Sequence, residues 1–345
     1  MKPLVDDIGS FPLPARVNRE TYNKAYQLAR DAMTNGHNIS EDKFIRENFY
    51  DVTINSFKLK MSTGLDVVNT PWHYDGVRQV NDAVHKAMET GTFVVDEKDA
   101  FLPEVRVVEA EAKRLYEEFG KKIALRVCMF GPMELYLQEI GTVAYRDVLA
   151  GFGETIRRFA KNSIVDTKYV KTEVISIDEP SFGFMNINAE REVLIEVLEK
   201  ACDFKGAVRQ IHLHSASRIP EVLKVGNIDV VSFEYGASPQ NIESVSRKML
   251  DDANKQIRVG VTRTDIGSIM AELSDKGTLN PTAEQIVEKP EVIRKRYLSA
   301  KQKYGDHMTF TGPDCGLGGW PSQETAQLLL KRTVDAIKKP YNFHE

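Results

Sequence analysis

The chain has 345 residues, 42% of them hydrophobic, which is enough apolar material for a large buried core. Its 46 basic and 50 acidic residues give a net charge of −4, without the excess of positive charge typical of nucleic-acid binding. The three cysteines, Cys128, Cys202 and Cys315, lie too far apart to indicate a disulfide framework, and this favours a reducing cytoplasm. The acidic N-terminus does not resemble a secretory signal, and no apolar run approaches the roughly 20 residues of a membrane span. We therefore expect a soluble, cytoplasmic protein with no nucleic-acid or membrane partner.

Eight short apolar runs typical of buried strands recur along the chain, and long amphipathic segments typical of helices separate the later ones. The predicted strands cover residues 4–10, 65–69, 123–130, 173–178, 208–214, 228–234, 256–262 and 307–312. The predicted helices cover residues 142–163, 189–204, 239–254 and 281–304. Strands that alternate with helices predict an α/β fold with a parallel sheet, and eight such units predict a closed (β/α)8 TIM barrel.

The connections that follow the first two predicted strands are unusually long. They cover residues 11–64 and 70–122 and contain helical patterns, so we expect inserted helices after the first and second strands. Segment 71–104 forms either an ordered wall or a moving lid in this prediction. No linker of low complexity and no internal repeat divides the chain, which favours a single domain over residues 1–345.

Polar side chains share one face at the ends of two neighbouring predicted strands. Gln210, His212 and His214 alternate with apolar residues on one strand, and Ser232 and Glu234 do so on the next. The carboxyl ends of barrel strands meet at one mouth, where active sites of this fold are built. We therefore expect these polar residues to converge there.

Cys315 follows the last predicted strand in the glycine-rich loop Gly312-Pro313-Asp314-Cys315-Gly316-Leu317-Gly318-Gly319-Trp320. By itself it is either a buried inert thiol or a reactive or metal-binding one. With His214 and Glu234 it offers nitrogen, oxygen and sulfur, a set that suits zinc better than magnesium or calcium. Three protein ligands leave one position open, as in catalytic zinc sites, and a thiol bound there is deprotonated. His212 is a possible fourth ligand, but a supporting role behind the ligands or simple packing is favoured for it.

Two further segments are candidates for binding the substrate. The side chains of Asp178 and Glu179 point to opposite faces of a strand, so only one of them enters the site. We expect that residue to be Asp178 and expect it to bind an ammonium group. The alternative for this segment is a helix cap in a turn between strand and helix. Ile8, Gly9 and Ser10 are either an ordinary turn or a place where backbone amides and a hydroxyl hold a carboxylate.

Five segments, in this order and across nearly the whole chain, resemble the catalytic half of cobalamin-independent methionine synthase. They are Asp7-Ile8-Gly9-Ser10-Phe11-Pro12, Ile177-Asp178-Glu179-Pro180, Gln210-Ile211-His212-Leu213-His214, Glu234 and Gly312-Pro313-Asp314-Cys315-Gly316-Leu317. The resemblance implies a zinc-dependent barrel that activates and methylates the thiol of homocysteine, forming methionine. It implies zinc ligands at His214, Glu234 and Cys315. It also implies an amino-acid site at Ile8, Gly9, Ser10, Asp178 and Glu179, with Asp178 as the catalytic residue.

With 345 residues, the chain is similar in length to the short "core" type of this family. The methyl donor of that type is therefore the one that the resemblance implies. That type implies a methylated corrinoid, either methylcobalamin or a corrinoid protein, rather than methyltetrahydrofolate. Gly131 and Pro132, after the third predicted strand, would lie near this donor. Trp72 and Trp320 are either buried packing residues or a surface for the flat corrinoid ring.

Two departures from the family pattern leave alternatives open. Ala216 stands where the family has a cysteine ligand, so zinc keeps three protein ligands unless His212 joins. In an alternative register His212 is the ligand and His214 takes the place of that cysteine. The segment Asn69-Thr70-Pro71-Trp72 stands where the family has His-Gly-Glu, so a usual contact with the amino acid is missing.

Other functions fit the same residues. In one alternative the protein is still a methyltransferase, but its methyl donor is methyltetrahydrofolate or its acceptor is another thiol such as coenzyme M. A metal-free lyase similar to porphyrinogen decarboxylase requires several cationic groups, but only Arg16 and Arg19 lie near the first predicted strand. A fourth possibility is a protein that binds a corrinoid or a thiol without catalysis. Ligand binding without turnover would identify it.

Overall fold

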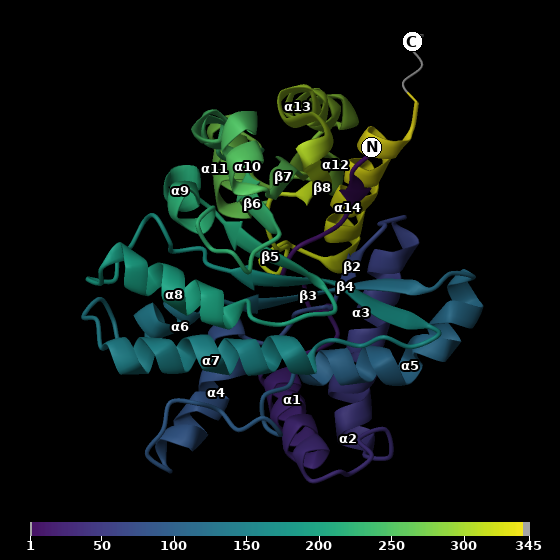
Figure 1. Cartoon of the computed structure of the whole chain (residues 1–345). Helices are drawn as coiled ribbons and strands as arrows, with labels where there is room; N and C mark the ends of the chain where they lie inside the picture. The colour runs from purple at the N-terminus through teal and green to yellow at the C-terminus, as the bar shows by residue number, and fades with distance from the viewer. Residues whose placement is uncertain (1, 341–345) are drawn as a thin grey trace.

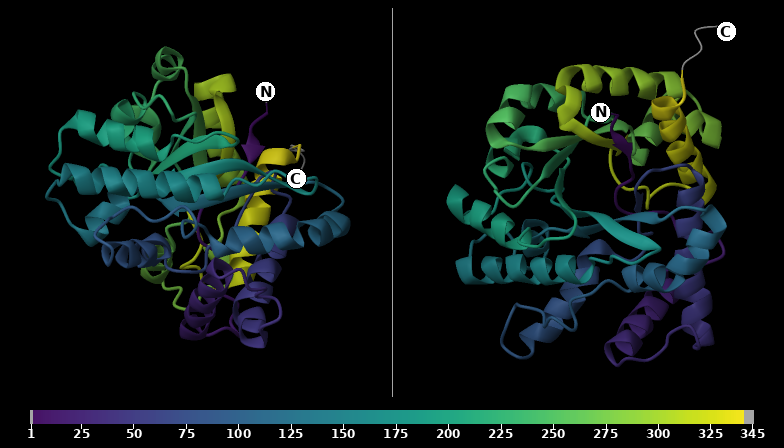
Figure 2. Two further views of the ribbon diagram at one scale, coloured as in Figure 1. Left: turned by 60° about the horizontal axis from the view of Figure 1, so that its bottom comes forward. Right: turned by 45° about the vertical axis from the view of Figure 1, so that its right-hand side comes forward.

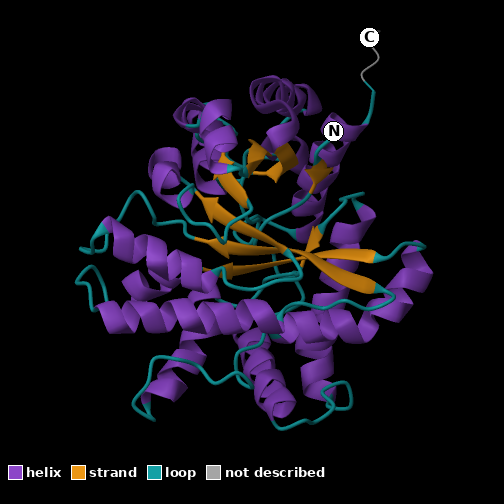
Figure 3. Cartoon of the chain, in the orientation of Figure 1, coloured by secondary structure: helices purple, strands orange, loops and turns teal. Residues whose placement is uncertain are grey.

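Eight parallel strands form one sheet in the part of the chain that the computed structural model describes, residues 2–340 (Figure 3). The strands are β1 (Leu4–Val5), β2 (Val68–Asn69), β3 (Ile123–Phe130), β4 (Val170–Asp178), β5 (Val208–Leu213), β6 (Val230–Glu234), β7 (Gln256–Thr262) and β8 (Met308–Pro313). Their order in the sheet is β1-β8-β7-β6-β5-β4-β3-β2. Residue 1 and residues 341–345 of the predicted domain lie outside the described residues.

The two edges of the sheet meet, which closes the barrel between β1 and β2. Asp6 and Val67 form a parallel bridge there. The backbone N–H groups of Asp66 and Val67 donate to the carbonyl oxygen of Val5 at 2.8 and 3.3 Å. Eight parallel strands that alternate with helices confirm the predicted (β/α)8 barrel, whose carboxyl strand ends form a common mouth.

All eight predicted strands are present, but the bounds differ most at the first and second strands, and β2 covers only Val68–Asn69 of the predicted 65–69. The predicted strand 4–10 is a ladder only at Leu4–Val5, with single bridges at Asp6 and Ser10, and the chain turns at Gly9, whose φ of +66° suits glycine. The predicted strand 173–178 begins earlier, at Val170.

Helices cover the outside of the sheet, and Figure 1 shows α7 and α8 side by side along one flank. The covering helices are α5 (Pro103–Phe119), α6 (Pro132–Glu139), α7 (Arg146–Asn162), α8 (Arg191–Ala201), α9 (Ile219–Val222), α10 (Arg247–Ala253), α11 (Ile266–Asp275), α12 (Ala283–Ile286), α13 (Pro290–Tyr304) and α14 (Gln323–Lys338). Short 3-10 turns are η2 (Ala216–Arg218), η3 (Pro239–Ser244) and η4 (Gly305–His307). Among residues 2–340, no helix combines the length and the apolar character needed to cross a membrane.

Two of the four predicted helices match the structure, and the local sequence explains why the other two are interrupted. The predictions 142–163 and 189–204 match α7 and α8. The prediction 239–254 is wrong as one helix, because Val245 is extended and Ser246 caps a new helix by accepting from the N–H of Met249. The prediction 281–304 splits at Lys289, since a residue before proline avoids the helical conformation and Pro290 begins α13.

The inserted helices predicted after the first and second strands are present. The first insertion holds α1 (Arg19–Thr34), α2 (Lys43–Ile45), the π-helical turn η1 (Arg46–Tyr50) and α3 (Asp51–Ser62). The second holds α4 (Gly76–Met88) before α5. Figure 2 shows α1, α2 and α4 projecting together from one side of the barrel. Segment 71–104 therefore contains the helix α4.

The interior of the barrel holds a carboxylate between two arginines, all three fully buried. Asp6 accepts from Nε of Arg258 at 2.7 Å and from Nη2 of Arg126. Arg126 also donates to Oε1 of Gln210 at 3.0 Å, and Arg258 donates to the carbonyl of Pro313 at 2.8 Å. These five residues connect β3, β5, β7 and β8 to the end of β1, so the network fixes the strands relative to one another.

Replacing Asp6 by Asn removes the carboxylate that pairs with both arginines. The substitution keeps the volume but leaves two buried positive charges, so the free energy of unfolding falls by about 3–5 kcal/mol. Urea unfolding followed by circular dichroism measures the change. The matched control is Asp252→Asn on α10, which breaks an exposed pair with Lys248 and costs at most about 0.5 kcal/mol. Equal losses in the two variants contradict a structural role for the buried network.

Candidate metal centre and its cavity

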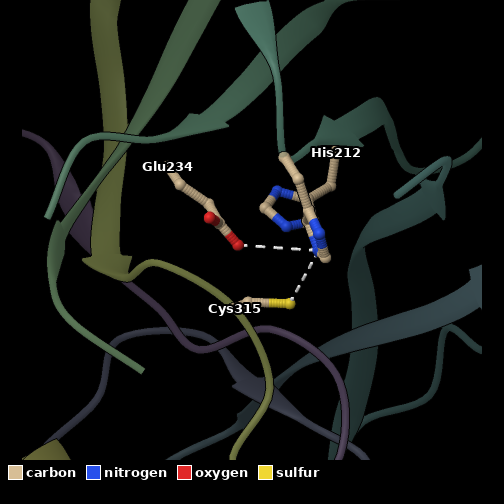
Figure 4. Close-up of side chains that lie close together, drawn as sticks. His212, Glu234 and Cys315 are labelled. Atoms are coloured by element: carbon tan, nitrogen blue, oxygen red, sulfur yellow. Dashed lines mark hydrogen bonds and ion pairs between the residues drawn. The ribbon is translucent and has the colours of Figure 1, made fainter. Parts of the chain in front are cut away.

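Four side chains at the carboxyl ends of the strands come together as a possible metal-binding group. His212 lies on β5, His214 follows it, Glu234 ends β6, and Cys315 follows β8. One ligand atom from each residue lies within 4.8 Å of all the others. Nε2 of His214 is 3.3 Å from Sγ of Cys315 and 3.5 Å from Oε1 of Glu234. Figure 4 shows His212, Glu234 and Cys315 facing the same point.

The ring of His212 lies within this group of four. The sequence favoured a supporting role behind the ligands or simple packing for it. Its Nδ1 lies 3.1 Å from Oγ of Ser232, and its Nε2 is buried with no hydrogen-bond partner. A proton on Nδ1 satisfies the bond to Ser232 and leaves the Nε2 lone pair free for a cation. A buried polar atom without a partner costs about 1–3 kcal/mol, which a bound cation offsets. This orphaned atom is the clearest sign that the residues present fit a metal ion.

The electrostatics of the four residues also fit a divalent cation. Burial lowers the pKa of both imidazoles, so His212 and His214 are neutral and carry a lone pair, as metal ligands must. Burial, with a smaller effect of Asp314 and Asp265, raises the pKa of Glu234 to about 8. Burial and the Glu234 carboxylate raise the pKa of the Cys315 thiol well above its usual value. A dication at this point reverses both effects, because it favours the carboxylate and the thiolate.

The metal-binding group opens into a cavity of about 550 Å³. From the sequence-predicted site, the residues that line it are Gly9, Ser10, Trp72, Asp178, His212, His214 and Cys315. Its outer wall comes from the inserted helices, with Arg19 and Asn23 on α1 and Gly76 and Arg78 on α4. The volume is in the usual range for small-molecule sites, so an amino acid fits inside it.

Asp178 ends β4 and lines the cavity, as the sequence predicts for the ammonium-binding residue. Oγ of Ser176 donates to its Oδ1 at 2.7 Å. Burial raises the pKa of Asp178 to about 7, and the hydrogen bond from Ser176 and the charges of Arg126 and Arg258 oppose that shift. A bound ammonium group acts in the same direction as the arginines and favours the carboxylate.

Glu179 does not line the cavity and caps a helix instead. Its carboxylate therefore contacts backbone groups of the protein, whereas the sequence predicted a contact with the bound amino acid. Its carboxylate accepts from the backbone N–H groups of Met133 and Glu134 at 3.0 and 2.7 Å, in the first turn of α6. Gly131 is close beneath it, since a Cβ there would lie 2.1 Å from Oε1 of Glu179. Gly131 and Pro132, predicted to lie on the donor side, therefore form the start of α6 and do not line the cavity.

The remaining predicted residues divide between lining and packing. Oγ of Ser10 accepts from the N–H of Gly318 at 3.0 Å. Ile8 is buried against Trp72 and does not line the cavity. Trp72 lines the cavity, but Trp320 is buried outside its lining and donates from Nε1 to the carbonyl of Thr264 at 3.0 Å. Packing, the alternative weighed for both tryptophans, is what the structure shows for Trp320.

Sequence reasoning did not find the cavity wall or the residues that hold the ligands. Arg19, Asn23 and Arg78 lie on inserted helices, whose position over the mouth no strand-end pattern predicts. Asn241, in a short 3-10 turn, donates to the carbonyl groups of His214 and Glu234. An asparagine in a polar turn carries no sequence signal for this role.

Comparisons with known proteins show the fold. No family model and no curated protein matches the chain. A B12-independent methionine synthase from Shewanella sp. W3-18-1, solved in complex with selenomethionine, is 14% identical with a TM-score of 0.58. The match covers 98% of this chain and 97% of that one. A GH113 β-1,4-mannanase, at 9% identity and a TM-score of 0.41, covers 96% of this chain and 98% of its own. At these identities the methionine synthase shows a shared barrel fold, and the mannanase carries no further argument.

Replacing Glu179 by Ala removes the acceptor of two buried N–H groups at the start of α6. We expect the free energy of unfolding to fall by at least about 2 kcal/mol, because each unsatisfied donor costs about 1–3 kcal/mol. Cation binding is unchanged, since Glu179 is not one of the four grouped residues. Urea unfolding and metal analysis measure the two effects. A variant with parental stability but without metal places Glu179 in the site instead.

Replacing His212 by Ala tests whether four residues or three bind a cation. We expect a loss of at least about tenfold in zinc affinity, comparable to that of His214→Ala, because Nε2 of His212 has no other partner. Competition with a chromophoric chelator measures the affinity. The control is His307→Ala, whose ring contacts Asp251 and the carbonyl of Lys255, outside the cavity. Parental affinity in His212→Ala reduces the ligand set to three.

Proposed function

We propose that this protein is a zinc-dependent methyltransferase that methylates the thiol of homocysteine. The observation that supports it most is the group of His212, His214, Glu234 and Cys315 beside the cavity that Asp178 lines. Neutral nitrogen, carboxylate oxygen and thiolate sulfur together favour zinc over magnesium and calcium. The methionine synthase that shares this fold was solved with a methionine analogue, which agrees with the proposal.

Zinc held by these residues would supply a positive charge that keeps the thiol of the substrate as a thiolate at neutral pH, and the thiol would replace one of the four protein ligands or join them. The residues of the chain place the amino acid. The Asp178 carboxylate binds its ammonium group, and the hydroxyl proton of Ser10 is free for its carboxylate because Oγ accepts from Gly318. In the reaction the thiol first loses its proton to solvent, and an electron pair of the resulting thiolate sulfur then forms the S–CH3 bond. The bond between the methyl group and the donor breaks, and its electron pair stays with the donor.

The donor predicted from the sequence is a methylated corrinoid, and the comparisons give it no support. The neighbouring methionine synthase is described as B12-independent, which conflicts with a corrinoid donor. The cavity wall adds aromatic side chains at Trp72 and Phe130 and cationic ones at Arg19 and Arg78, a set that suits a flat donor with acidic groups. The carboxylates of methyltetrahydrofolate match the two arginines, whereas the ring of methylcobalamin carries amides, and the assay compares both donors.

The decarboxylase-like alternative has less support in the described residues. Such a lyase requires several cations for the carboxylates of its substrate. Among residues 2–340, the lysines and arginines that line the cavity are Arg19 and Arg78, and both lie in its outer wall.

Methionine formation tests the proposal. The zinc-loaded protein is incubated with homocysteine and either methylcobalamin or methyltetrahydrofolate, and a parallel arm replaces homocysteine by coenzyme M. We expect methionine with one of the donors, and a loss of at least about a hundredfold in Cys315→Ala, which lacks one ligand. The matched control, Cys202→Ala, changes a buried thiol at the end of α8 and keeps the activity.

The outcomes separate the candidates. Turnover with coenzyme M alone overturns homocysteine as the acceptor and retains thiol methylation. No methyl transfer to either thiol, from either donor, by a protein that has taken up zinc overturns the proposed function.

A further inference from the structure

The three segments that carry the ligands are joined by two buried side chains that are not themselves in the metal-binding group. The first is Asn241 in η3, which is 4% exposed. Its Nδ2 donates to the carbonyl oxygen of His214 at 2.8 Å and to that of Glu234 at 2.9 Å. Its Oδ1 accepts from the N–H of Ala216 at 3.1 Å. One side chain thus fixes the backbone of two ligand residues relative to each other.

The second side chain is Asp314, which is fully buried and directly precedes Cys315. Its Oδ1 accepts from the N–H groups of Tyr235 and Gly236 at 3.2 and 2.9 Å, and its Oδ2 accepts from that of Ala237. These three amides directly follow Glu234. Asp314 therefore ties the loop that carries Cys315 to the end of β6.

The chain is shaped to let Asp314 reach these amides. β7 lies between β6 and β8 in the sheet, so the Asp314 side chain crosses the end of β7. A Cβ at Gly260 of β7 would lie 2.5 Å from Oδ1 of Asp314, and one at Gly236 would lie 2.6 Å from Oδ2. Glycine at both positions makes the close approach possible.

We propose that Asn241 and Asp314 are positioning residues that hold His214, Glu234 and Cys315 in their metal-binding arrangement before a metal ion binds. The two side chains make three hydrogen bonds each to backbone groups at the ligand-bearing segments. Backbone positions fixed in advance lower the entropy that metal binding has to overcome. This inference rests on the proposed metal site, and it assigns the preorganisation of that site to two residues of this chain.

The first test compares zinc affinity in Asn241→Ala and Asp314→Asn with that of the parent. The alanine removes all three bonds of Asn241, and the asparagine replaces one acceptor oxygen by a donor that faces an N–H group. Loss of such partners typically lowers metal affinity about 10- to 100-fold, and we expect a decrease in this range for each variant. Chelator competition measures the affinity, and the visible absorption of the cobalt-substituted protein reports a changed ligand geometry.

Two matched controls separate positioning from general stability. Nδ2 of Asn162, at the end of α7, also donates to two carbonyl groups, those of Glu97 and Ala100. The carboxylate of Glu199, on α8, also accepts from two consecutive backbone N–H groups, those of Gly226 and Asn227, at the amino end of β6. We expect Asn162→Ala and Glu199→Gln to lower the melting temperature while the zinc affinity and the cobalt spectrum stay unchanged.

A third readout needs no metal. In the metal-free parent, amide hydrogen exchange at Ala216 and at residues 235–237 is expected to be slow, and the two test variants are expected to accelerate it at least about tenfold.

The inference is overturned if the parent binds zinc and both test variants retain its affinity and cobalt spectrum, or if these amides exchange rapidly in the metal-free parent. A parent that binds no zinc overturns the proposed function instead, and the exchange data then decide the positioning role on their own.

Discussion

The carboxylate of Asp6 holds several strands of this barrel in place relative to one another. It lies between the guanidinium groups of Arg126 and Arg258, where apolar side chains fill the interior of most barrels. Two positive charges and one negative charge are thereby buried, and burial without these contacts is strongly unfavourable. Because the arginines also bind Gln210 and Pro313, the strands cannot shift independently of β1. The register that this network sets also sets the height at which the strand ends reach the mouth.

The metal-binding group follows from that register together with one strand that contributes no ligand. β5, β6 and β8 each carry a residue of this group at or just beyond the carboxyl end, whereas β7, between the last two, has Gly260 near its end. The missing side chain lets Asp314 cross β7 and accept from the amides after Glu234. The absence of a side chain on one strand is therefore as important to the site as the four grouped residues on its neighbours.

The sequence predicted the parts of the site that depend on local periodicity. Alternation placed His212, His214 and Glu234 on one face, and the rule for strand ends brought Cys315 beside them. It did not predict the role of Glu179, whose partner N–H groups lie about 45 residues away on α6. Nor did it predict the cavity wall, because the position of α1 and α4 depends on packing between distant segments. Asn241 was missed for the same reason, since its partner groups lie just beyond β5 and at the end of β6, and the composition of its own turn gives no signal.

The order of the elements along the chain has a consequence for synthesis and folding. β1 is made first, and its hydrogen-bonded neighbour β8 is made about 300 residues later. Cys315, which follows β8 directly, is also the last of the four grouped residues to leave the ribosome. Closure of the barrel and completion of the four-residue group therefore both wait for the last part of the chain. A chain that ends before β8 therefore lacks both a strand of the closed sheet and the only sulfur atom of the four grouped residues.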